Sequence, residues 1–302
     1  MHVDKFHHRF SELFDETQEL EHIAGGFDFT EGPVWNPLGN TIIFSDILGN
    51  SIYQWSQKGG LKKIRRNSYM ANGNAYDKQG RVLTCEHATN RVTRTDFQNN
   101  GEIEVLATHY NGKQLNSPND IICKRDGMIY FTDPAAGRTA GFGVPRPQEL
   151  DFQGVYRLDP SDLSLLLLAD DFSKPNGLCF SLDETRLFIN DSAHDHIRVF
   201  DIGRDGLLVN GQVWGSLKRV GSGVADGMKV DSSENIFCCG PGGIHIFDAQ
   251  ANYLGIIHMP EQTANLCWGD DDLCSLYITA TTSLYRLRTK IPGHSTFNSQ
   301  QA

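Results

Sequence analysis

Asn176-Gly-Leu-Cys-Phe180 opens a short pattern that returns along most of this 302-residue chain. A turn-forming stretch, Ser181–Glu184, follows it, and apolar segments come next at Leu187–Ile189 and Ile197–Phe200. Asp, Asn, Ser and Gly tolerate or cap such turns. The alternating apolar and polar residues of the later segment indicate a half-buried strand. With a weaker fourth segment at Val213-Trp214, the pattern predicts a small sheet of four strands.

The same opening occurs six times, each time with an oxygen-bearing side chain at its head. These six residues, called the anchors below, are Glu31, Asn72, Asn119, Asn176, Asp226 and Asn265. Successive anchors stand 41, 47, 57, 50 and 39 residues apart, which is the period of propeller blades rather than of helical repeats. The sequence therefore predicts an all-β fold, a six-bladed β-propeller. A stack of two sandwiches is the alternative, and six matched openings disfavour it.

The sixth repeat lacks a fourth strand after Leu287. An apolar segment just before the first repeat, Leu20–Ala24, is the candidate for it. Donation of this N-terminal strand to the last blade would close the ring and remove exposed edges.

No linker rich in Pro, Gly or Ser interrupts the repeats, so we expect a single domain over residues 1–302. Residues 1–17 form an N-terminal extension, and residues 292–302 form a polar tail that is predicted to fray. Helical spacing, which predicts a short helix docked across the propeller, is found at Phe6, Phe10, Leu13 and Phe14.

The net charge of −10 argues against nucleic-acid binding, which requires a basic surface. No apolar run approaches the ~18 residues needed to span a bilayer, so no membrane association is expected. The first eight residues lack the apolar centre of a signal peptide. Seven cysteines, mostly inside apolar strand segments and without a Cys-x-x-Cys pair, predict free thiols and a cytoplasmic location.

The anchors carry the chemistry. In a propeller the first strand of each blade lines the central channel, so we expect all six anchors at one mouth. Glu31 and Asp226 supply two negative charges, and the four amides supply neutral oxygens. Such an oxygen shell suits Ca²⁺, Mg²⁺ or Mn²⁺, with Fe²⁺ and Zn²⁺ left open. Taken singly, each anchor could instead cap a turn. His194-Asp-His196 could also chelate a metal, but its position in a hairpin favours a turn.

Several separate motifs resemble the regucalcin/gluconolactonase family, most closely its bacterial gluconolactonase branch. They include Glu31-Gly-Pro-Val-Trp35, Asn116-Ser-Pro-Asn-Asp120, Tyr130-Phe-Thr-Asp-Pro134, Lys174-Pro-Asn-Gly-Leu178 and Asp226-Gly-Met-Lys-Val-Asp231. The resemblance runs in order from about Glu31 to Arg288. It implies a six-bladed propeller that holds one divalent cation, often calcium, and hydrolyses sugar lactones such as glucono-1,5-lactone.

The resemblance also implies roles for individual residues. Glu31, Asn176 and Asp226 would be metal ligands, and Asn119 would reach the metal shell or the substrate. Asp226 would also donate and accept protons. The animal members place an arginine two residues before the Asn119 position, where this chain has Ser117. Substrate contacts of that arginine therefore do not carry over.

Further residues are candidates for substrate contact. Asn72 and Asn74 could bind sugar hydroxyls. His87 and Asp133, just past the second strands of their blades, could share proton transfer with Asp226; the alternative for His87 is a hydrogen-bonding role at the rim. The long segment 135–153 is rich in Gly and Pro and predicts a lid over the mouth.

Three functions compete at this point. The first is a metal-dependent lactonase acting on a small-molecule sugar lactone as a monomer or homodimer. The second is a hydrolase of another lactone or of an organophosphate ester on the same ring. The third is a non-enzymatic metal-binding propeller. Carboxylates that face the channel favour an enzyme.

Overall fold

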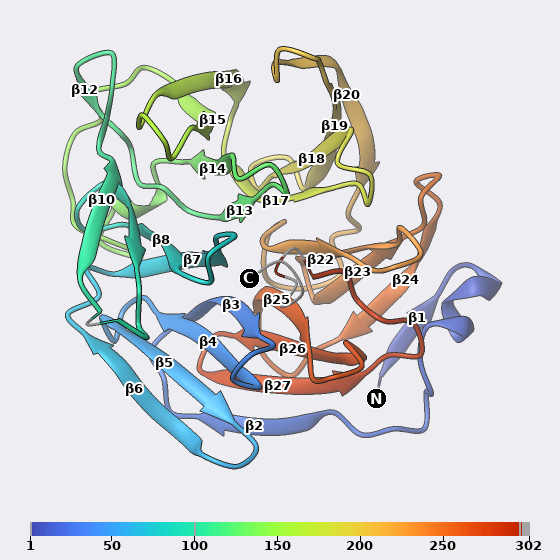
Figure 1. Cartoon of the computed structure of the whole chain (residues 1–302). Coiled ribbons are helices and arrows are strands. Elements are labelled where there is room, and N and C mark those ends of the chain that lie inside the picture. The colour runs from blue at the N-terminus through green and yellow to red at the C-terminus, as the bar shows by residue number, and fades with distance from the viewer. Residues whose placement is uncertain (1, 100, 296, 298–302) are drawn as a thin grey trace.

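The computed structural model describes residues 2–99, 101–295 and 297. Its strands form six small antiparallel sheets arranged as blades around a central axis (Figure 1). The all-β six-bladed propeller predicted from the repeats is therefore confirmed. Among the described residues, the helices are two short 3₁₀ turns, and no helix is long and apolar enough to cross a membrane.

The strands of the first three blades follow the sequence in order from the channel outward. Blade 1 contains β3 (Thr30–Asn36), β4 (Thr41–Asp46), β5 (Ser51–Ser56) and β6 (Gly60–Arg66). Blade 2 contains β7 (Ala71–Tyr76), β8 (Val82–Glu86), β9 (Arg91–Thr95) and β10 (Ile103–Ala107). A small hairpin follows, β11 (His109–Tyr110) and β12 (Lys113–Gln114). Blade 3 contains β13 (Ile121–Cys123), β14 (Ile129–Asp133), β15 (Gln153–Leu158) and β16 (Leu165–Phe172), with the 3₁₀ turn η2 (Ala136–Arg138) between β14 and β15.

The last three blades keep this order, and two of them gain a strand from the N-terminus. Blade 4 contains β17 (Pro175–Phe180), β18 (Arg186–Asp191), β19 (His196–Ile202) and β20 (Leu208–Ser216). Blade 5 contains β21 (Met228–Val230), β22 (Ile236–Gly240), β23 (Gly243–Phe247), β24 (Tyr253–His258) and the N-terminal β1 (Val3–Lys5). Blade 6 contains β25 (Thr263–Gly269), β26 (Ser275–Ala280), β27 (Ser283–Arg288) and the N-terminal β2 (Glu21–Gly25).

Blade 6 is closed by the strand that the sequence predicts. β2 pairs antiparallel with β27, from Glu21 opposite Arg286 to Gly25 opposite Ser283. Blade 6 also packs on blade 1, where Trp35 stacks on Tyr277 with ring centroids 5.7 Å apart. The two ends of the repeat array are thus joined by hydrogen bonds and by apolar packing.

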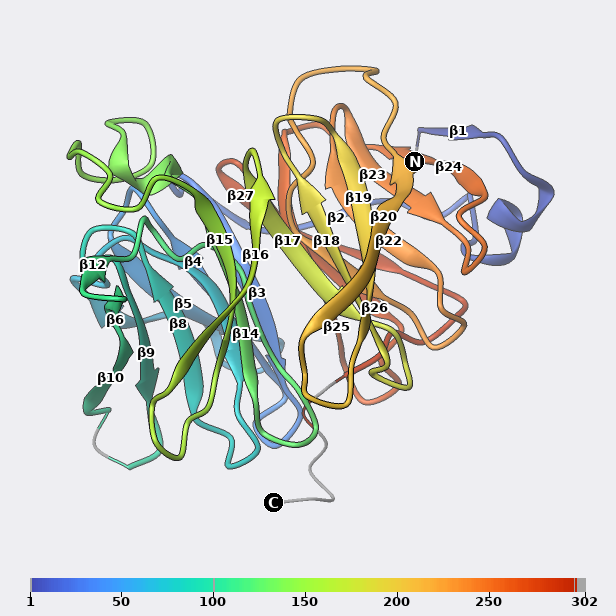
Figure 2. The same ribbon diagram turned by 90° about the horizontal axis from the view of Figure 1, so that it is seen from above.

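The N-terminal extension contains one strand that the sequence analysis missed. β1 adds to the outer edge of blade 5 through β24, and Figure 2 shows the two strands side by side on the flank of the ring. A 3₁₀ turn, η1 (His8–Glu12), comes next. Phe10 and Phe14 are buried against blades 5 and 6, whereas Phe6 is 48% exposed.

The described part of the C-terminal tail is packed rather than frayed. Gly293 forms a β-bridge with Asp231, and the Phe297 side chain is 6% exposed beside Tyr76, with ring centroids 5.1 Å apart. The Phe297 ring is buried because it lines an apolar cavity together with Trp35, Tyr76 and Trp268. Residues 296 and 298–302 of the predicted frayed segment lie outside the described residues.

Replacing Phe14 with Ala should lower the free energy of unfolding by about 3–5 kcal/mol, because it deletes a fully buried ring. Phe14 is 1% exposed and meets the edge of Phe237 at a centroid distance of 6.0 Å. Denaturant titration measures the change. The matched control, Phe6→Ala, should cost about 1 kcal/mol or less. Equal losses in the two variants would contradict the docking of this segment.

Candidate active site

Five of the six anchors line one cavity at a mouth of the channel. The cavity has a volume of about 200 Å³, which suits a small ligand. Its lining consists of Phe29, Glu31, Ile47, Asn72, His87, Asn119, Ala136, Phe142, Lys174, Asn176, Val224, Asp226 and Gln262. The sixth anchor, Asn265, lies behind this wall and donates a hydrogen bond from Nδ2 to Glu31 Oε2 at 3.1 Å. We call this cavity the anchor pocket.

Glycine after the anchor lets the inner strands converge on the pocket. Four anchors precede such a glycine, namely Gly32, Gly73, Gly177 and Gly227. A Cβ atom at any of them would lie under 3.0 Å from an atom of the next blade's anchor. Side chains in that position would push the blades apart, so glycine there is a requirement of the close approach.

In three blades an aspartate at the end of the second strand holds the backbone that leads to the anchor. These residues are Asp46, Asp133 and Asp191. Each accepts the N–H groups of the two residues that stand three and two places before the anchor of its own blade. The pairs are Asp28 and Phe29 on Asp46, Asn116 and Ser117 on Asp133, and Ser173 and Lys174 on Asp191.

This repetition corrects the role predicted for Asp133. Its side chain is fully buried and does not line the anchor pocket. Burial raises the pKa of Asp133 to about 7, while the N–H groups of Asn116 and Ser117 oppose that rise. Because Asp46 and Asp191 make the same contacts, Asp133 is a backbone clamp and not a substrate-binding group.

Asn74 also lies outside the anchor pocket. Its Nδ2 donates to Gly32 O at 2.9 Å and to Ser45 Oγ at 2.8 Å, while its Oδ1 accepts from Thr84 Oγ1. The amide therefore joins two blades inside the wall of the channel. A residue two places after an anchor points away from the mouth, which the sequence analysis overlooked.

The two acidic anchors, Glu31 and Asp226, are buried carboxyl groups with raised pKa values. Burial raises the pKa of Glu31 to about 7, with a further contribution from the carboxyl group of Asp120. Burial also raises the pKa of Asp226 well above its usual value, and the Glu31 charge adds to this. Two buried carboxyl groups of like charge are costly without a counter-ion. A divalent cation between them would remove that cost.

The amide anchors present oxygen atoms that have no partner. Asn176 donates from Nδ2 to Ser192 Oγ at 3.0 Å, and its Oδ1 is buried without a hydrogen bond. Asn72 donates from Nδ2 to His87 Nε2 at 3.0 Å, and its Oδ1 is likewise buried and unpaired. Buried polar atoms are rarely left unpaired. These two carbonyl oxygens, with the two carboxylates, fit the oxygen shell of a hard divalent cation.

His87 orients Asn72 and holds the overlying loop. Its Nδ1 lies 2.8 Å from Phe142 O, and since a carbonyl only accepts, Nδ1 carries the proton. Nε2 of the neutral ring then accepts from Asn72. Burial lowers the pKa of His87 to about 4, which keeps the ring neutral at pH 7. Both ring nitrogens are occupied, so this histidine has no free lone pair for proton transfer.

The segment 135–153 reaches the pocket through Ala136 and Phe142. Its base is anchored by Arg138, whose guanidinium donates to Asn116 O at 2.8 Å and to Leu115 O at 2.7 Å. Ser117 is fully buried and makes a second attachment of the segment, since its Oγ accepts a hydrogen bond from Gly137 N at 2.9 Å. The serine at this position therefore fixes the loop.

Several lining residues were missed by the sequence analysis, and three share one position. Phe29, Lys174 and Val224 each stand two residues before an anchor. Asp46 and Asp191 hold the backbone at Phe29 and Lys174, whose side chains reach the pocket. In blade 3 the same position is Ser117, which is fully buried and does not line the pocket. The signal was available, because the arginine of the resembled family occupies the same position in the third blade.

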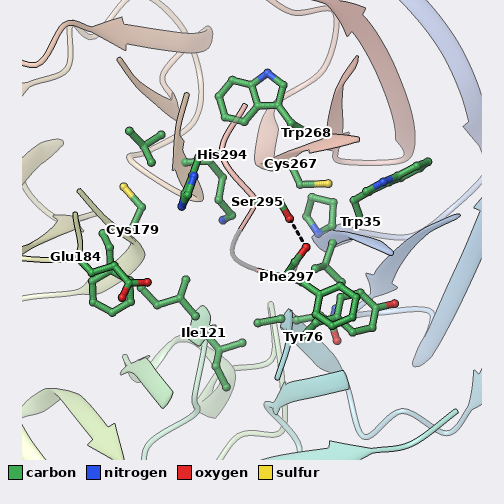
Figure 3. Close-up of a pocket in the computed structure, with 18 residues that line it drawn as sticks. Trp35, Tyr76, Ile121, Cys179, Glu184, Cys267, Trp268, His294, Ser295 and Phe297 are labelled. Atoms are coloured by element: carbon green, nitrogen blue, oxygen red, sulfur yellow. Dashed lines mark hydrogen bonds between the residues drawn. The ribbon is translucent and has the colours of Figure 1, made fainter. Parts of the chain in front are cut away.

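A second cavity lies at the opposite end of the channel, where His294, Ser295 and Phe297 of the C-terminal tail are among its lining residues (Figure 3). Trp35, Tyr76, Trp268 and Phe297 give it an apolar wall, and Ser295 Oγ lies 3.0 Å from Phe297 O. None of the acidic anchors lines it. It is therefore not the candidate active site.

Two other groups gather imidazole and carboxylate side chains, Asp191, His194 and His196 in one, and His2, Asp4 and His258 in the other. None of these residues lines the anchor pocket. Asp191 is already a backbone clamp, and the histidines beside it belong to the hairpin between β18 and β19. In the other group, His258 Nε2 lies 2.8 Å from Asp4 Oδ2, which ties β1 to β24.

Comparison with known proteins decides the family. The family model described as SMP-30/Gluconolactonase/LRE-like region matches residues 29–282. The chain belongs to this family. The resemblance identified from the motifs is thereby confirmed.

Individual members of the family show how much of the chain is shared. The gluconolactonase of Zymomonas mobilis is 31% identical over 96% of this chain and 87% of that protein. Human regucalcin is 25% identical over 82% of each chain. A solved structure of a gluconolactonase from Xanthomonas campestris is 32% identical, covers 95% of this chain and 94% of that one, and superposes with a TM-score of 0.87.

Neutralising either acidic anchor should stabilise the metal-free protein at pH 7. The pKa of Glu31 rises from 4.5 to about 7 on folding, so the folded chain keeps a proton that the unfolded chain has released. Stability from this group is present below the lower value and is lost as pH rises through the upper one. We therefore expect Glu31→Gln to raise the free energy of unfolding by about 1–3 kcal/mol at pH 7 and to leave it unchanged near pH 4.

Thermal unfolding in the presence of a chelator, at several pH values, measures this difference. Asp226→Asn should behave in the same way. Glu12→Gln is the control, because the Glu12 side chain is 61% exposed. A variant that is less stable than wild type at pH 7 would contradict the account.

Proposed function

We propose that the chain is a metal-dependent hydrolase that opens sugar lactones, such as glucono-1,5-lactone, to the aldonic acid. One observation carries the proposal: a small pocket gathers two buried carboxylates and unpaired amide oxygens. Membership of the family supports the reaction, since relatives are named gluconolactonase and pentonolactonase. A cytoplasmic location and a monomeric or homodimeric state stay predictions.

Glu31, Asn176 and Asp226 would hold one divalent cation, and Asn119 would complete its shell or contact the substrate. Calcium is the first choice because all donors are oxygen atoms, while Mg²⁺, Mn²⁺, Zn²⁺ and Fe²⁺ are the alternatives. When bound, such an ion polarises the lactone carbonyl and acidifies water. Protein side chains would supply proton transfer, stabilisation of the oxyanion and substrate binding.

Asp226 would move the protons. Its carboxylate accepts a proton from the water that attacks the lactone carbonyl, and it returns that proton to the ring oxygen when the ring opens. Burial raises the pKa of Asp226, and the ammonium of Lys174, which lines the same pocket, opposes that rise. Its positive charge would also stabilise the oxyanion that develops on the carbonyl oxygen.

The remaining lining residues would bind the sugar. Asn72, held by His87, lines the pocket, and its unpaired carbonyl oxygen would accept from a sugar hydroxyl unless the metal takes it. Phe29 and Phe142 meet edge to face, with centroids 5.1 Å apart. This pair would cover one side of the substrate, so the segment 135–153 acts as a lid that limits access of water.

Asp226→Asn should reduce kcat for lactone hydrolysis by about 10²–10⁴-fold, because it removes the group that transfers the proton. The rate is followed by acid release in weakly buffered solution against the spontaneous background. Asp170→Asn, which changes an exposed carboxylate, is the control and should leave kcat unaltered. Chelation of the wild-type enzyme should give a comparable loss, reversed by adding back the cation. Full activity in the variant or in the chelated enzyme would exclude this function and favour a non-enzymatic propeller.

Phe142→Ala should raise KM by about 3- to 10-fold with a smaller effect on kcat, since it removes a substrate-covering ring and leaves the acidic anchors intact. Val144→Ala in the same loop is the matched control, because that side chain is 45% exposed. Steady-state kinetics on glucono-1,5-lactone separate the two constants. An unchanged KM would show that the loop does not cover the substrate.

A further inference from the structure

Lys229 places an ammonium group inside the channel, beneath the anchor pocket. The residue belongs to β21 and also lines the lower cavity. Its Nζ donates to Asn265 Oδ1 at 3.2 Å and to Met228 O at 3.1 Å. The carboxylate of Asp120 lies close by, with Oδ2 at 3.8 Å from Nζ. These three contacts are what the Lys229 side chain contributes to the channel.

The ammonium and the backbone N–H of Leu266 together fix which way the Asn265 amide faces. A lysine only donates, so the atom turned toward it must be the carbonyl oxygen. The N–H of Leu266 donates to the same oxygen at 2.9 Å. The Nδ2 nitrogen of Asn265 therefore faces the opposite side, where it donates a hydrogen bond to Glu31 Oε2 at 3.1 Å.

Glu31 is oriented in its turn. Its Oε2 also accepts from Gly32 N at 2.6 Å, so in the described part of the chain both hydrogen bonds to this carboxylate go to one oxygen. Oε1 is left for a cation in the pocket. The chain of contacts from Lys229 through Asn265 sets the rotation of a metal-ligating carboxylate.

The charges agree with this arrangement. Glu31, Asp226 and Asp120 bring three carboxyl groups into the channel, and Asp120 raises the pKa of both others. The ammonium groups of Lys229 and Lys174 offset part of this charge. The three carboxyl groups outnumber them, so the channel keeps a negative charge that favours a cation.

We propose that Lys229 is a positioning residue of the metal centre, which acts on Glu31 through Asn265. The inference rests on the proposed function only in requiring that the anchor pocket binds a divalent cation. It makes a prediction opposite to simple electrostatics. Removal of a positive charge near a cation site should strengthen cation binding by Coulomb's law. Loss of the hydrogen-bond relay that runs from Lys229 through Asn265 to Glu31 should instead weaken it.

Isothermal titration of the full-length, metal-free protein with Ca²⁺, and with Mn²⁺ in a parallel series, distinguishes the two. Lys229→Met keeps most of the aliphatic stem and removes the charge and the donor. We expect its dissociation constant to rise by about 10- to 100-fold, the loss that outer partners of metal ligands typically cause. Lys62→Met, on the exposed outer strand of blade 1, is the charge-matched control and should bind as wild type does.

Asn265→Ala tests the relay from its other end and replaces Lys229→Met if that variant does not fold. It should weaken binding to a similar extent, and the double variant should be no worse than either single one, because both changes break the same chain of contacts. Equal or tighter binding by Lys229→Met, or fully additive losses, would overturn the inference. If the wild type binds the cation but hydrolyses no lactone, only the proposed function fails. If the wild type binds no cation, both fail.

Discussion

The structure depends on how closely the innermost strands approach one another at the anchors. Glycine follows four of the six anchors, and a single Cβ at any of them would collide with the next blade. This contact gathers residues from five blades, such as Glu31 and Asp226, around one small pocket. Each glycine affects only the contact between two neighbouring blades. Because the blades form a closed ring, these contacts together set the position of every anchor.

Two further features fix the positions of the backbone and of the amide side chains around the pocket. The clamp carboxylates Asp46, Asp133 and Asp191 hold the backbone that leads into three anchors, and in two of these blades the residue two places before the anchor lines the pocket, as Phe29 and Lys174. Neutral hydrogen-bonding partners such as His87 and Ser192 bind the amide nitrogens and leave the carbonyl oxygens unpaired. The hydrogen bonds of these partners thus leave carbonyl oxygens available to a ligand of the pocket, which fits the proposed cation site.

Much of this could be predicted from the sequence, because the repeat spacing, the anchors and the closing strand are local patterns. Asn74 and Asp133 were wrongly expected at the pocket, since distance along the chain from an anchor does not reveal the direction of a side chain. Comparison of Asp133 with Asp46 and Asp191 would have exposed its structural role. The contact between Lys229 and Asn265 joins different blades, so no pattern within one repeat could indicate it. The packing of Phe297 likewise depends on a cavity formed by distant strands.

The anchors are proposed to hold one divalent cation. The most direct test is a crystal structure of the protein grown with Mn²⁺, with the anomalous signal of the metal used to locate it. The account predicts a single strong peak within coordination distance of oxygen atoms of Glu31, Asn176 and Asp226. A peak elsewhere, with the anchor pocket filled only by water, would contradict it.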